Sequence, residues 1–365
     1  MKVILLHDWL TGFRGGERVL EVFCEMFPNA PLYTLLHKKG SVPSSIEDRK
    51  IVTSFIDNIP GSHNHYRKLL PLFPSAAESL RITEKADLVL SSSHCVIKGV
   101  KKPDAAKHVC YIHSPMRYLY DQYDNYFGPQ SPWYQRFGIK FFKNGLVSWD
   151  KLSNKNVDLF LANSQFVKQR ISKYYELESE VVHPFVDLED FKLDEDLPKK
   201  EDFYLMVTAF APNKKVSLAI DAFNKMGKTL KIIGGGQQEE LLRQKANSNI
   251  EFLGNCTREE VINFFKRARG FVFPGVEDFG ITPLESLASG TPVIARKIGG
   301  VLETLNEDVA EFFEEDTVES LIEAVESFEK KTFSTEIMRA RARDFSKENF
   351  KNHIKNHLES IIENK

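Results

Sequence analysis

Residues 270–300 read GFVFPGVEDFGITPLESLASGTPVIARKIGG and have the pattern of a strand, a loop, a helix and a second strand. The apolar run 270–273 is short and β-prone, as expected of a strand covered on both faces of a parallel sheet. Residues 293–295 have the same character. Gly290 lies between the two runs, and glycine commonly ends helices because it adopts the left-handed conformation at little cost. The stretch therefore predicts an α/β fold with a parallel sheet.

The helix of this unit is predicted to begin at the sequence TPLE. Thr282 suits an N-cap, Pro283 the first helical position and Glu285 the third, which would complete a capping box. Its N-terminus would follow the carboxyl end of a strand, where open α/β sheets bind anionic ligands. Glu285 has two readings, a helix cap alone or a ligand-binding carboxylate. Glu277, in the loop before the helix, is placed to accept hydrogen bonds from sugar or ribose hydroxyls.

The pair Glu277 and Glu285, set in PGVEDFGITPLESLASGTPVIA, resembles the EX7E motif of retaining glycosyltransferases of the GT-B fold, family 4. In that family the first glutamate holds hydroxyls of the transferred sugar and the second holds the ribose of the nucleotide. Backbone amides of the turn between them contact the donor. The resemblance implies these roles for Glu277, Glu285 and the backbone of Gly280, Ile281 and Thr282.

Length and composition exclude several classes of protein. A chain of 365 residues is long for one hydrophobic core, so two domains are expected. The formal net charge of -2 argues against a dedicated nucleic-acid binder. The four cysteines are far apart in sequence, which suggests neither a zinc site nor a disulfide framework and fits the cytosol. The N-terminal apolar run is too short for a signal peptide, and no stretch is long and apolar enough to span a membrane.

The first half of the chain begins with a predicted strand at 3–6 and a helix at 17–27. Between them, Gly15 and Gly16 open the helix, which lets a backbone approach a phosphate, although the loop does not contain GxGxxG. A plain tight turn is the alternative. The phrase GGERVL resembles the first loop of the same family, which implies that Gly15 and Gly16 face the donor diphosphate.

Further strands are predicted at 87–90, 109–112 and 157–161. The second of these ends in His113, and a lone histidine at a strand end is more often structural than catalytic. The segment YIHSPMRYLYD, however, resembles the acceptor-domain motif of the family, whose histidine lies against the transferred sugar. The resemblance implies that His113 belongs to the active site.

The second domain is expected to follow a charged stretch, 187–202, that reads as a linker. The linker contains Asp194-Glu195-Asp196, a DxD pattern that holds a metal in another transferase fold. Here it is interpreted as solvated linker charge. Strands predicted at 204–207, 230–233 and 250–253 then alternate with helices, as in a second doubly wound sheet.

Two lysines open a predicted helix at residue 216, where the helix dipole disfavours cations. An anionic ligand would explain Lys214 and Lys215. The resembled family has an arginine and a lysine here for the donor diphosphate, and Lys214 aligns with that lysine. Ala209 occupies the arginine position, which leaves diphosphate neutralisation to Lys214, to Lys215 and to helix-end amides.

The resemblance implies two Rossmann-like, doubly wound domains facing across a cleft. Residues 1–187 would form the acceptor side, and residues 203–345 would bind the nucleotide sugar. The amphipathic segment 346–365, with Ser346 as its N-cap, would return to the first domain, and an ordinary helix on the second domain is the alternative.

The implied activity is retaining, metal-independent sugar transfer with no cofactor besides the donor. The closest resemblance, in GVEDFGITPLESLASGTPVIA and NKKVSLAIDAF, is to bacterial mannosyltransferases of O-antigen and exopolysaccharide assembly. It implies GDP-mannose as donor and a lipid-linked or glycan acceptor, as in lipopolysaccharide synthesis. The alternatives are a nucleotide-sugar epimerase on the same fold and a non-catalytic sugar-nucleotide or glycan-binding protein.

Aromatic and basic residues alternate along WYQRFGIKFFK, residues 133–143. On a helix, Arg136, Lys140 and Lys143 share one face, with Phe137 and Phe141 beside them, as in an interfacial element. We therefore expect a cytoplasmic protein that associates peripherally with an anionic membrane surface, on the inner face of the cell membrane. The alternative is that the aromatics are core and the cations are merely solvated.

Overall fold

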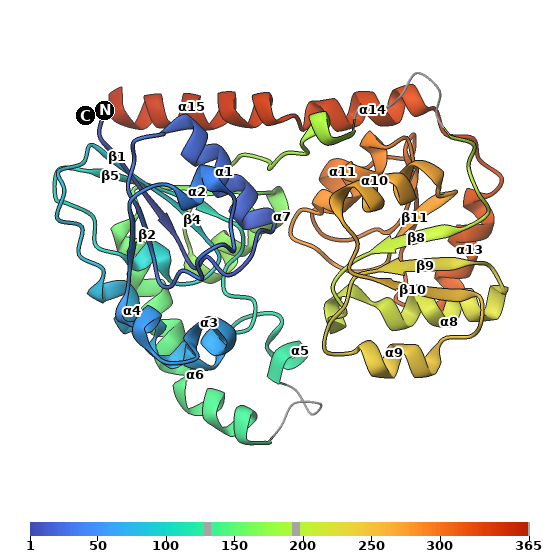
Figure 1. The fold of residues 1–365 in the computed structure, drawn as a ribbon, viewed down its shortest axis with the longest axis horizontal. Helices are drawn as coiled ribbons and strands as arrows, with labels where there is room; N and C mark the ends of the chain where they lie inside the picture. The colour runs from blue at the N-terminus through green and yellow to red at the C-terminus, as the bar shows by residue number, and fades with distance from the viewer. Residues whose placement is uncertain (128–132, 192–197, 364–365) are drawn as a thin grey trace. The chain divides into compact units, whose positions relative to one another are not determined.

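The computed structural model describes residues 1–127, 133–191 and 198–363, and the chain forms two compact units (Figure 1). The first comprises Met1–His183 and Lys351–Lys365, and the second comprises Pro184–Phe350. Each unit contains its own parallel sheet, which confirms the α/β class with two doubly wound domains. The acidic Asp194-Glu195-Asp196 lies outside the described residues.

The sheet of the first unit has seven strands, and every neighbouring pair is parallel. In spatial order they are β3 (Ile51–Thr53), β2 (Leu32–Thr34), β1 (Val3–His7), β4 (Leu88–Ser93), β5 (Lys107–Ile112), β6 (Leu159–Ala162) and β7 (Glu180–Val181). The helices of this unit are α1 (Gly15–Met26), α2 (Ser44–Glu47), α3 (Ser62–His65), α4 (Phe73–Ser79), α5 (Tyr123–Phe127), α6 (Trp133–Ser153) and α7 (Gln165–Tyr175). Short 3-10 segments connect them: η1 (Phe55–Asn58), η2 (Tyr66–Leu72), η3 (Ile97–Gly99) and η4 (Asn154–Asn156).

The sheet of the second unit has six strands, again all parallel. Their order is β10 (Ile250–Gly254), β9 (Leu230–Ile233), β8 (Tyr204–Val207), β11 (Gly270–Phe273), β12 (Val293–Arg296) and β13 (Ala310–Phe313). The helical segments are η5 (Leu188–Phe191), η6 (Pro212–Lys214), α8 (Val216–Met226), α9 (Glu239–Lys245), α10 (Arg258–Arg267), α11 (Ile281–Ala288), α12 (Val301–Thr304), α13 (Val318–Phe328) and α14 (Thr335–Asp344). The last helix, α15 (Lys347–Glu363), begins in this unit, and most of it belongs to the first.

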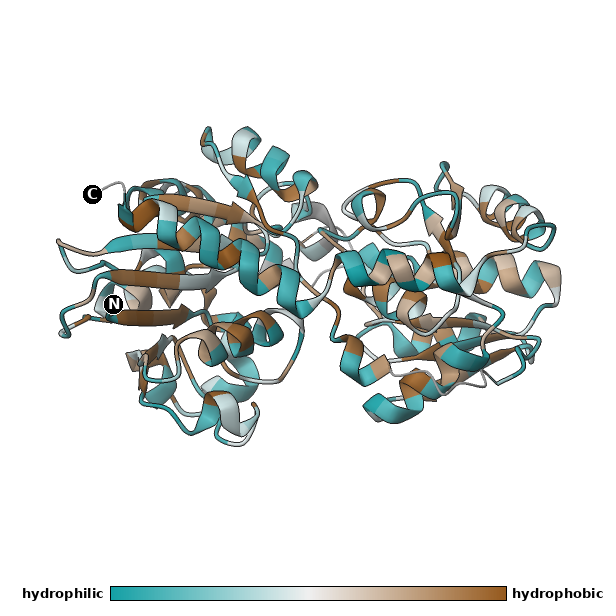
Figure 2. Ribbon diagram, turned by 90° about the horizontal axis from the view of Figure 1, so that it is seen from above, coloured by the Kyte–Doolittle hydropathy of each residue, from teal (hydrophilic) through white to brown (hydrophobic). Residues whose placement is uncertain are grey.

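The strands β1 and β11, which lie inside the two sheets, are buried along their whole length. All five residues of β1 and all four of β11 are buried, as expected for strands covered by helices on both faces of a sheet. Strands are the most hydrophobic segments in Figure 2, whereas the helices that cover them alternate between hydrophobic and hydrophilic residues. Burial of apolar strands thus builds each sheet, and the amphipathic helices shield it from water.

Each sheet has one place where the strand order reverses. In the first unit the chain runs from β1 outward to β2 and β3, and then crosses to β4 on the other side of β1. In the second unit it runs from β8 to β9 and β10, and then crosses to β11. In open α/β sheets, ligands bind at the carboxyl ends of the strands at such a switch point. The loops after β1, β4, β8 and β11 are therefore the places to look for a site.

The boundary between the units lies earlier than the charged stretch 187–202. Val186 already belongs to the second unit, because its amide donates a hydrogen bond to the Phe345 carbonyl at 2.9 Å. The helix α15 begins after Ser346, whose hydroxyl accepts a hydrogen bond from the Asn349 amide at 3.3 Å. From Lys351 onward α15 groups with the first unit, and Lys351 Nζ lies 2.9 Å from Glu25 Oε2 of α1.

Candidate active site

Two side chains at the switch point of the second unit form an ion pair. Lys214 ends η6, in the loop after β8, and Glu277 lies in the loop after β11, the strand beside β8. The Lys214 ammonium contacts the Glu277 carboxylate, and both side chains are largely buried, with 23% and 15% of their surface exposed. The structure thus brings together two residues that the sequence placed in the site separately.

Glycines hold the Glu277 loop against its neighbours. A Cβ on Gly275 would lie 2.8 Å from the Asn213 carbonyl oxygen, closer than real contacts allow, so only glycine permits this approach. On the other side, the Gly300 amide donates to the Glu277 carbonyl at 3.0 Å, and a Cβ on Gly299 would lie 2.7 Å from that same oxygen. The backbone of Glu277 is therefore fixed between two loops.

Lys215 does not share the position of Lys214. It adopts a left-handed conformation (φ 54°) as the residue before α8, and its ammonium lies 2.6 Å from Asp316 Oδ2. Arg296 Nη1 lies 3.2 Å from the same oxygen. Ala209, at the position where the resembled family has an arginine, is exposed in the loop after β8. Lys214 is thus the lysine of the pair that contacts Glu277.

The helix α11 corrects the expected capping box. It begins at Ile281, and its N-cap is Gly280 in a left-handed conformation (φ 90°), so Thr282 is already inside the first turn. No side chain among the described residues caps this end. The positive φ of Gly280, which costs glycine little, lets the chain enter the helix earlier than the Thr-Pro pattern indicates. The first amides of α11 have no intrahelical acceptor, which leaves Gly280, Ile281 and Thr282 at the end that attracts anions.

Glu285 is held by a cation and does not act as a cap. Its Oε1 accepts a hydrogen bond from Arg258 Nη1 at 2.6 Å, and Arg258 Nε lies 3.0 Å from Asp190 Oδ2. Arg258 is the first residue of α10, and its guanidinium lies over the Phe191 ring at 4.6 Å from the centroid. Glu285 therefore presents a carboxylate that Arg258 orients, and a carboxylate can accept further hydrogen bonds.

Imidazoles gather at the switch point of the first unit. His113 directly follows β5, and its Nε2 lies 2.7 Å from the Ser92 hydroxyl oxygen on β4. His7, the last residue of β1, places Nδ1 3.2 Å from the same hydroxyl. Burial lowers the pKa of His113 well below its ordinary value, and the neighbouring His94 and His7 add to that direction. At neutral pH His113 is thus an uncharged imidazole that both donates and accepts hydrogen bonds.

The helix α1 starts at Gly15, and its second residue, Gly16, packs against these imidazoles. A Cβ at Gly16 would lie 3.6 Å from His7 Cε1 and 3.7 Å from His113 Nε2, so a larger side chain would fill this space. Glu17 places Oε1 3.7 Å from His7 Nε2. Burial raises the pKa of Glu17, but interaction with His7 outweighs it and the pKa is lowered to about 2. An ionised carboxylate therefore directly follows the glycine pair in sequence and lies near the His7 imidazole.

Asp8 and His94 were missed by the sequence analysis. Both directly follow strands that meet at the switch point, Asp8 after β1 and His94 after β4. Each is a polar residue at the end of an apolar strand, as His113 is. That pattern alone favours a structural role, and His113 was singled out by the resemblance of YIHSPMRYLYD to a family motif.

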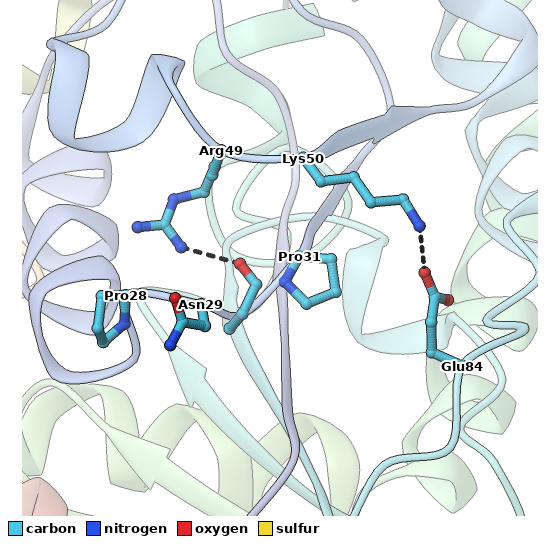
Figure 3. Close-up of a pocket in the computed structure, with 7 residues that line it drawn as sticks. Pro28, Asn29, Pro31, Arg49, Lys50 and Glu84 are labelled. Atoms are coloured by element: carbon cyan, nitrogen blue, oxygen red, sulfur yellow. Dashed lines mark hydrogen bonds and ion pairs between the residues drawn. The ribbon is translucent and has the colours of Figure 1, made fainter.

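A pocket lies at the opposite edge of the same sheet (Figure 3). Pro31 and Lys50, in its lining, immediately precede β2 and β3, so the pocket is at the amino ends of the strands. Its cations are already engaged: Arg49 Nη1 donates to the Ala30 carbonyl at 2.9 Å, and Lys50 Nζ lies 2.5 Å from Glu84 Oε1. This pocket contains none of the residues singled out above.

Two family models match consecutive parts of the chain. The model described as Glycosyltransferase Family 4 matches residues 15–190, and the model described as Glycosyl transferases group 1 matches residues 188–348.

Curated relatives are similar over part of their length. An uncharacterized glycosyltransferase of Methanocaldococcus jannaschii is 30% identical over 156 residues, 41% of this chain and 43% of that protein. O-antigen chain mannosyltransferase C of Escherichia coli is 34% identical over 115 residues, 30% of this chain and 31% of that protein. Human alpha-1,3/1,6-mannosyltransferase ALG2 is 25% identical over 240 residues, 56% and 58% of the two chains. The chain therefore spans between 31% and 58% of the length of these relatives.

Solved structures match almost the whole chain. A sucrose-phosphate synthase from Thermosynechococcus elongatus superposes with a TM-score of 0.77 at 16% identity and covers 100% of both chains. WaaG, a glycosyltransferase involved in lipopolysaccharide biosynthesis, superposes with a TM-score of 0.66 at 15% identity and covers 96% of this chain and 94% of its own. At these identities the likeness concerns the fold alone, and it confirms the expected GT-B fold.

Proposed function

We propose that this chain, which belongs to the family 4 glycosyltransferases of the GT-B fold, transfers a sugar from a nucleotide donor to a hydroxyl of an acceptor. The observation that carries the proposal is the contact between Lys214 and Glu277 at the switch point of the second sheet. A cation for a diphosphate and a carboxylate for sugar hydroxyls are thereby placed side by side, which is what a nucleotide sugar requires.

The donor-binding roles follow from the chemistry of each group. Glu277 would accept hydrogen bonds from hydroxyls of the transferred sugar, and Lys214 would neutralise the diphosphate. Lys215 would contribute less to this neutralisation, because its charge is paired with Asp316. Glu285, oriented by Arg258, would accept hydrogen bonds from the ribose. The amides of Gly280, Ile281 and Thr282 would face the phosphates, as helix N-termini commonly do.

On the first unit, we assign Gly15 and Gly16 to the approach of the donor diphosphate and His113 to the transferred sugar. The glycine pair at the start of α1 leaves the backbone open, and the neutral imidazole of His113 suits a hydroxyl group, because it offers both a donor and an acceptor.

The proposed transfer retains configuration and needs no metal and no further cofactor. As the bond between the sugar C1 and the diphosphate oxygen breaks, negative charge develops on the diphosphate and positive charge on the sugar ring. The acceptor oxygen forms its bond to C1 on the face that the diphosphate leaves, and its proton passes to the departing phosphate oxygen. Lys214 and the amides of α11 stabilise the first charge, and Glu277 stabilises the second through the sugar hydroxyls.

We propose GDP-mannose as the donor. The support is the description of two relatives as mannosyltransferases, one of them acting on O-antigen chains. We extend this to a lipid-linked or glycan acceptor in cell-surface polysaccharide synthesis, such as lipopolysaccharide or exopolysaccharide.

The test combines binding with turnover. GDP-mannose should raise the melting temperature more than UDP- or ADP-sugars at the same concentration. Stabilisation by a bound ligand grows with the ratio of its concentration to its dissociation constant. GDP release should require an acceptor and persist in EDTA.

Conversion of the donor without any acceptor would favour an epimerase. Donor binding without GDP release would favour a non-catalytic binding protein, the reading that Ala209 supports. Loss of activity in EDTA that magnesium restores would contradict the metal-independent step.

We also propose that the protein works peripherally on the inner face of the cell membrane. Among the described residues, no helix combines the length and hydropathy needed to cross a bilayer. On α6, Phe137 and Phe141 expose 73% and 79% of their surface, so these two aromatics are not core. Arg136 and Lys140, also exposed, accompany them on the helix. We call these four residues the α6 patch, and its mixture of aromatic and basic side chains suits an anionic lipid surface.

A further inference from the structure

His94 occupies the first unit's switch point, where a substrate is expected, and the assigned roles do not include it. It follows β4 directly, beside the end of β1. Its ring centroid lies 6.2 Å from that of His113 and 6.2 Å from that of His7. Its side chain keeps 31% of its surface exposed, while His7 is fully buried. His94 is thus an accessible imidazole immediately beside His113.

The turn that carries His94 is anchored to β1 by one carboxylate. Asp8 is fully buried and accepts four backbone hydrogen bonds, two on each oxygen, at 2.7–2.9 Å. The donors are the amides of His94, Cys95, Val96 and Ile97. Since every one of these bonds joins the end of β1 to the turn after β4, the His94 backbone has little freedom to move.

The orientation of the His94 ring is also fixed. Its Nδ1 lies 3.4 Å from Asp8 Oδ2, and the ring meets Trp9 edge-on at a centroid distance of 4.4 Å. Because an ionised carboxylate can only accept, the tautomer that suits this contact carries the proton on Nδ1. Nε2 is then a hydrogen-bond acceptor.

The charge state of this pair of imidazoles selects the class of ligand. Desolvation lowers the pKa of His94, with the Asp8 carboxylate opposing the shift, and burial lowers the pKa of His113 further. Two neutral imidazoles suit hydroxyl groups, which both donate and accept hydrogen bonds, better than they suit an anion, which needs cations.

We propose that His94 contacts the acceptor, its Nε2 accepting a hydrogen bond from an acceptor sugar hydroxyl, and that Asp8 is the residue that positions it. The inference rests on the proposed glycosyl transfer and adds a specificity-determining residue on the first unit. His94 takes up no proton in this role, and the proton of the acceptor hydroxyl still passes to the departing phosphate oxygen.

The kinetic test compares His94→Gln and His94→Ala with the wild-type protein, using GDP-mannose as donor and octyl α-mannoside as probe acceptor. Loss of one hydrogen bond to the acceptor should raise the KM for octyl α-mannoside about tenfold and leave the KM for GDP-mannose within about twofold. The matched control is His63→Gln, since His63 also pairs with a carboxylate, Asp57, at 2.8 Å, but lies on α3. An unchanged acceptor KM in both His94 variants would overturn the proposal.

A binding measurement separates this inference from the proposed function. Diethyl pyrocarbonate modifies accessible neutral imidazoles, and peptide mass spectrometry quantifies each site. Octyl α-mannoside should protect His94 at least severalfold and leave His63 unprotected. Equal modification of His94 with and without octyl α-mannoside would overturn the assignment even if the wild-type protein transfers mannose. Protection of His94 in a protein that releases no GDP would support the acceptor contact and contradict the transferase activity.

Discussion

Lys214 and Glu277 contact each other although they lie in different loops, one after β8 and the other after β11. The two charges offset each other, which lowers the cost of holding two ions in a largely buried place. A nucleotide sugar would offer new partners to both, a diphosphate to the lysine and hydroxyls to the carboxylate. We therefore expect the donor to compete with the ion pair for both side chains.

Glu277→Gln should reduce turnover by about two orders of magnitude or more, the scale seen when one transition-state contact is removed. The amide keeps the size of the side chain but cannot offset the positive charge of the sugar. The fold should remain intact, and a circular dichroism spectrum like that of the wild-type protein would exclude unfolding as the cause. Turnover near the wild-type level would refute the role of Glu277.

Lys214→Ala should weaken GDP-mannose binding more than Lys215→Ala does. The two substitutions remove the same charge from adjacent residues, but only Lys214 contacts Glu277, whereas Lys215 pairs with Asp316. Calorimetric titration with GDP-mannose at low and moderate salt would measure both affinities. Equal losses would mean that the contact with Glu277 does not mark the diphosphate position.

Glu285→Gln should weaken GDP binding with little effect on the stability of α11. The structure removes the capping role, so the expected result differs from that of a capping box, where about 1 kcal/mol of stability would be lost. The variant also weakens the charge-assisted bond to Arg258, which Arg258→Gln would test from the other side. If GDP affinity were unchanged in both variants, Glu285 would be a structural partner of Arg258 only.

The sequence predicted most of the strands but not β2, β3, β7 and β13, and it predicted the side-chain pairings poorly. The bounds of β8, β9 and β11 agree with the runs predicted at 204–207, 230–233 and 270–273, because each run is mostly buried and ends at polar or turn residues. The start of α11 was misplaced, since the conformation of Gly280 is set by the packed loop and not by the Thr-Pro pattern.

The sequence indicated several candidate site residues but not the partners that hold them. Glu277, Glu285, His113 and Lys214 carry local patterns, but their partners are distant in sequence and are brought close by the sheets. Arg258 reaches Glu285 from another helix. Asp8 reaches the turn after β4 from the end of β1, and nothing in the spacing of the two segments indicates this.

Lys98→Met should destabilise the first unit by about 3–5 kcal/mol, because it leaves a buried carboxylate without its cation. Lys98 Nζ lies 2.7 Å from Asp150 Oδ1, and the two side chains expose 1% and 0% of their surface. Urea unfolding would measure the loss. The control is Lys102→Met, which breaks a pair of 2.8 Å with Asp158 whose side chains are 22% and 29% exposed, and should cost about 0–1 kcal/mol. Similar losses in the two variants would contradict the special role of burial.

Anionic vesicles should bind the protein through the α6 patch, and added salt should weaken that binding. Each basic residue near an anionic leaflet contributes on the order of 1 kcal/mol, and Phe137 and Phe141 add apolar contact with the lipid. Lys143 is left out of the variant because its ammonium lies 3.7 Å from the centroid of the Tyr123 ring. Cosedimentation with phosphatidylglycerol vesicles should therefore fall sharply for Arg136→Ala/Lys140→Ala and for Phe137→Ser/Phe141→Ser.

The matched control for the basic pair is Lys38→Ala/Lys39→Ala, which removes the same charge from exposed positions of the first unit outside α6. It should sediment as the wild-type protein does, because the proposal places the contact on the patch and not on net charge. An equal loss of vesicle binding in the control would mean that binding depends on the net charge of the protein and not on the α6 patch. Wild-type protein that stays in solution at low salt would leave the exposed phenylalanines of α6 without a lipid partner and reject peripheral membrane association.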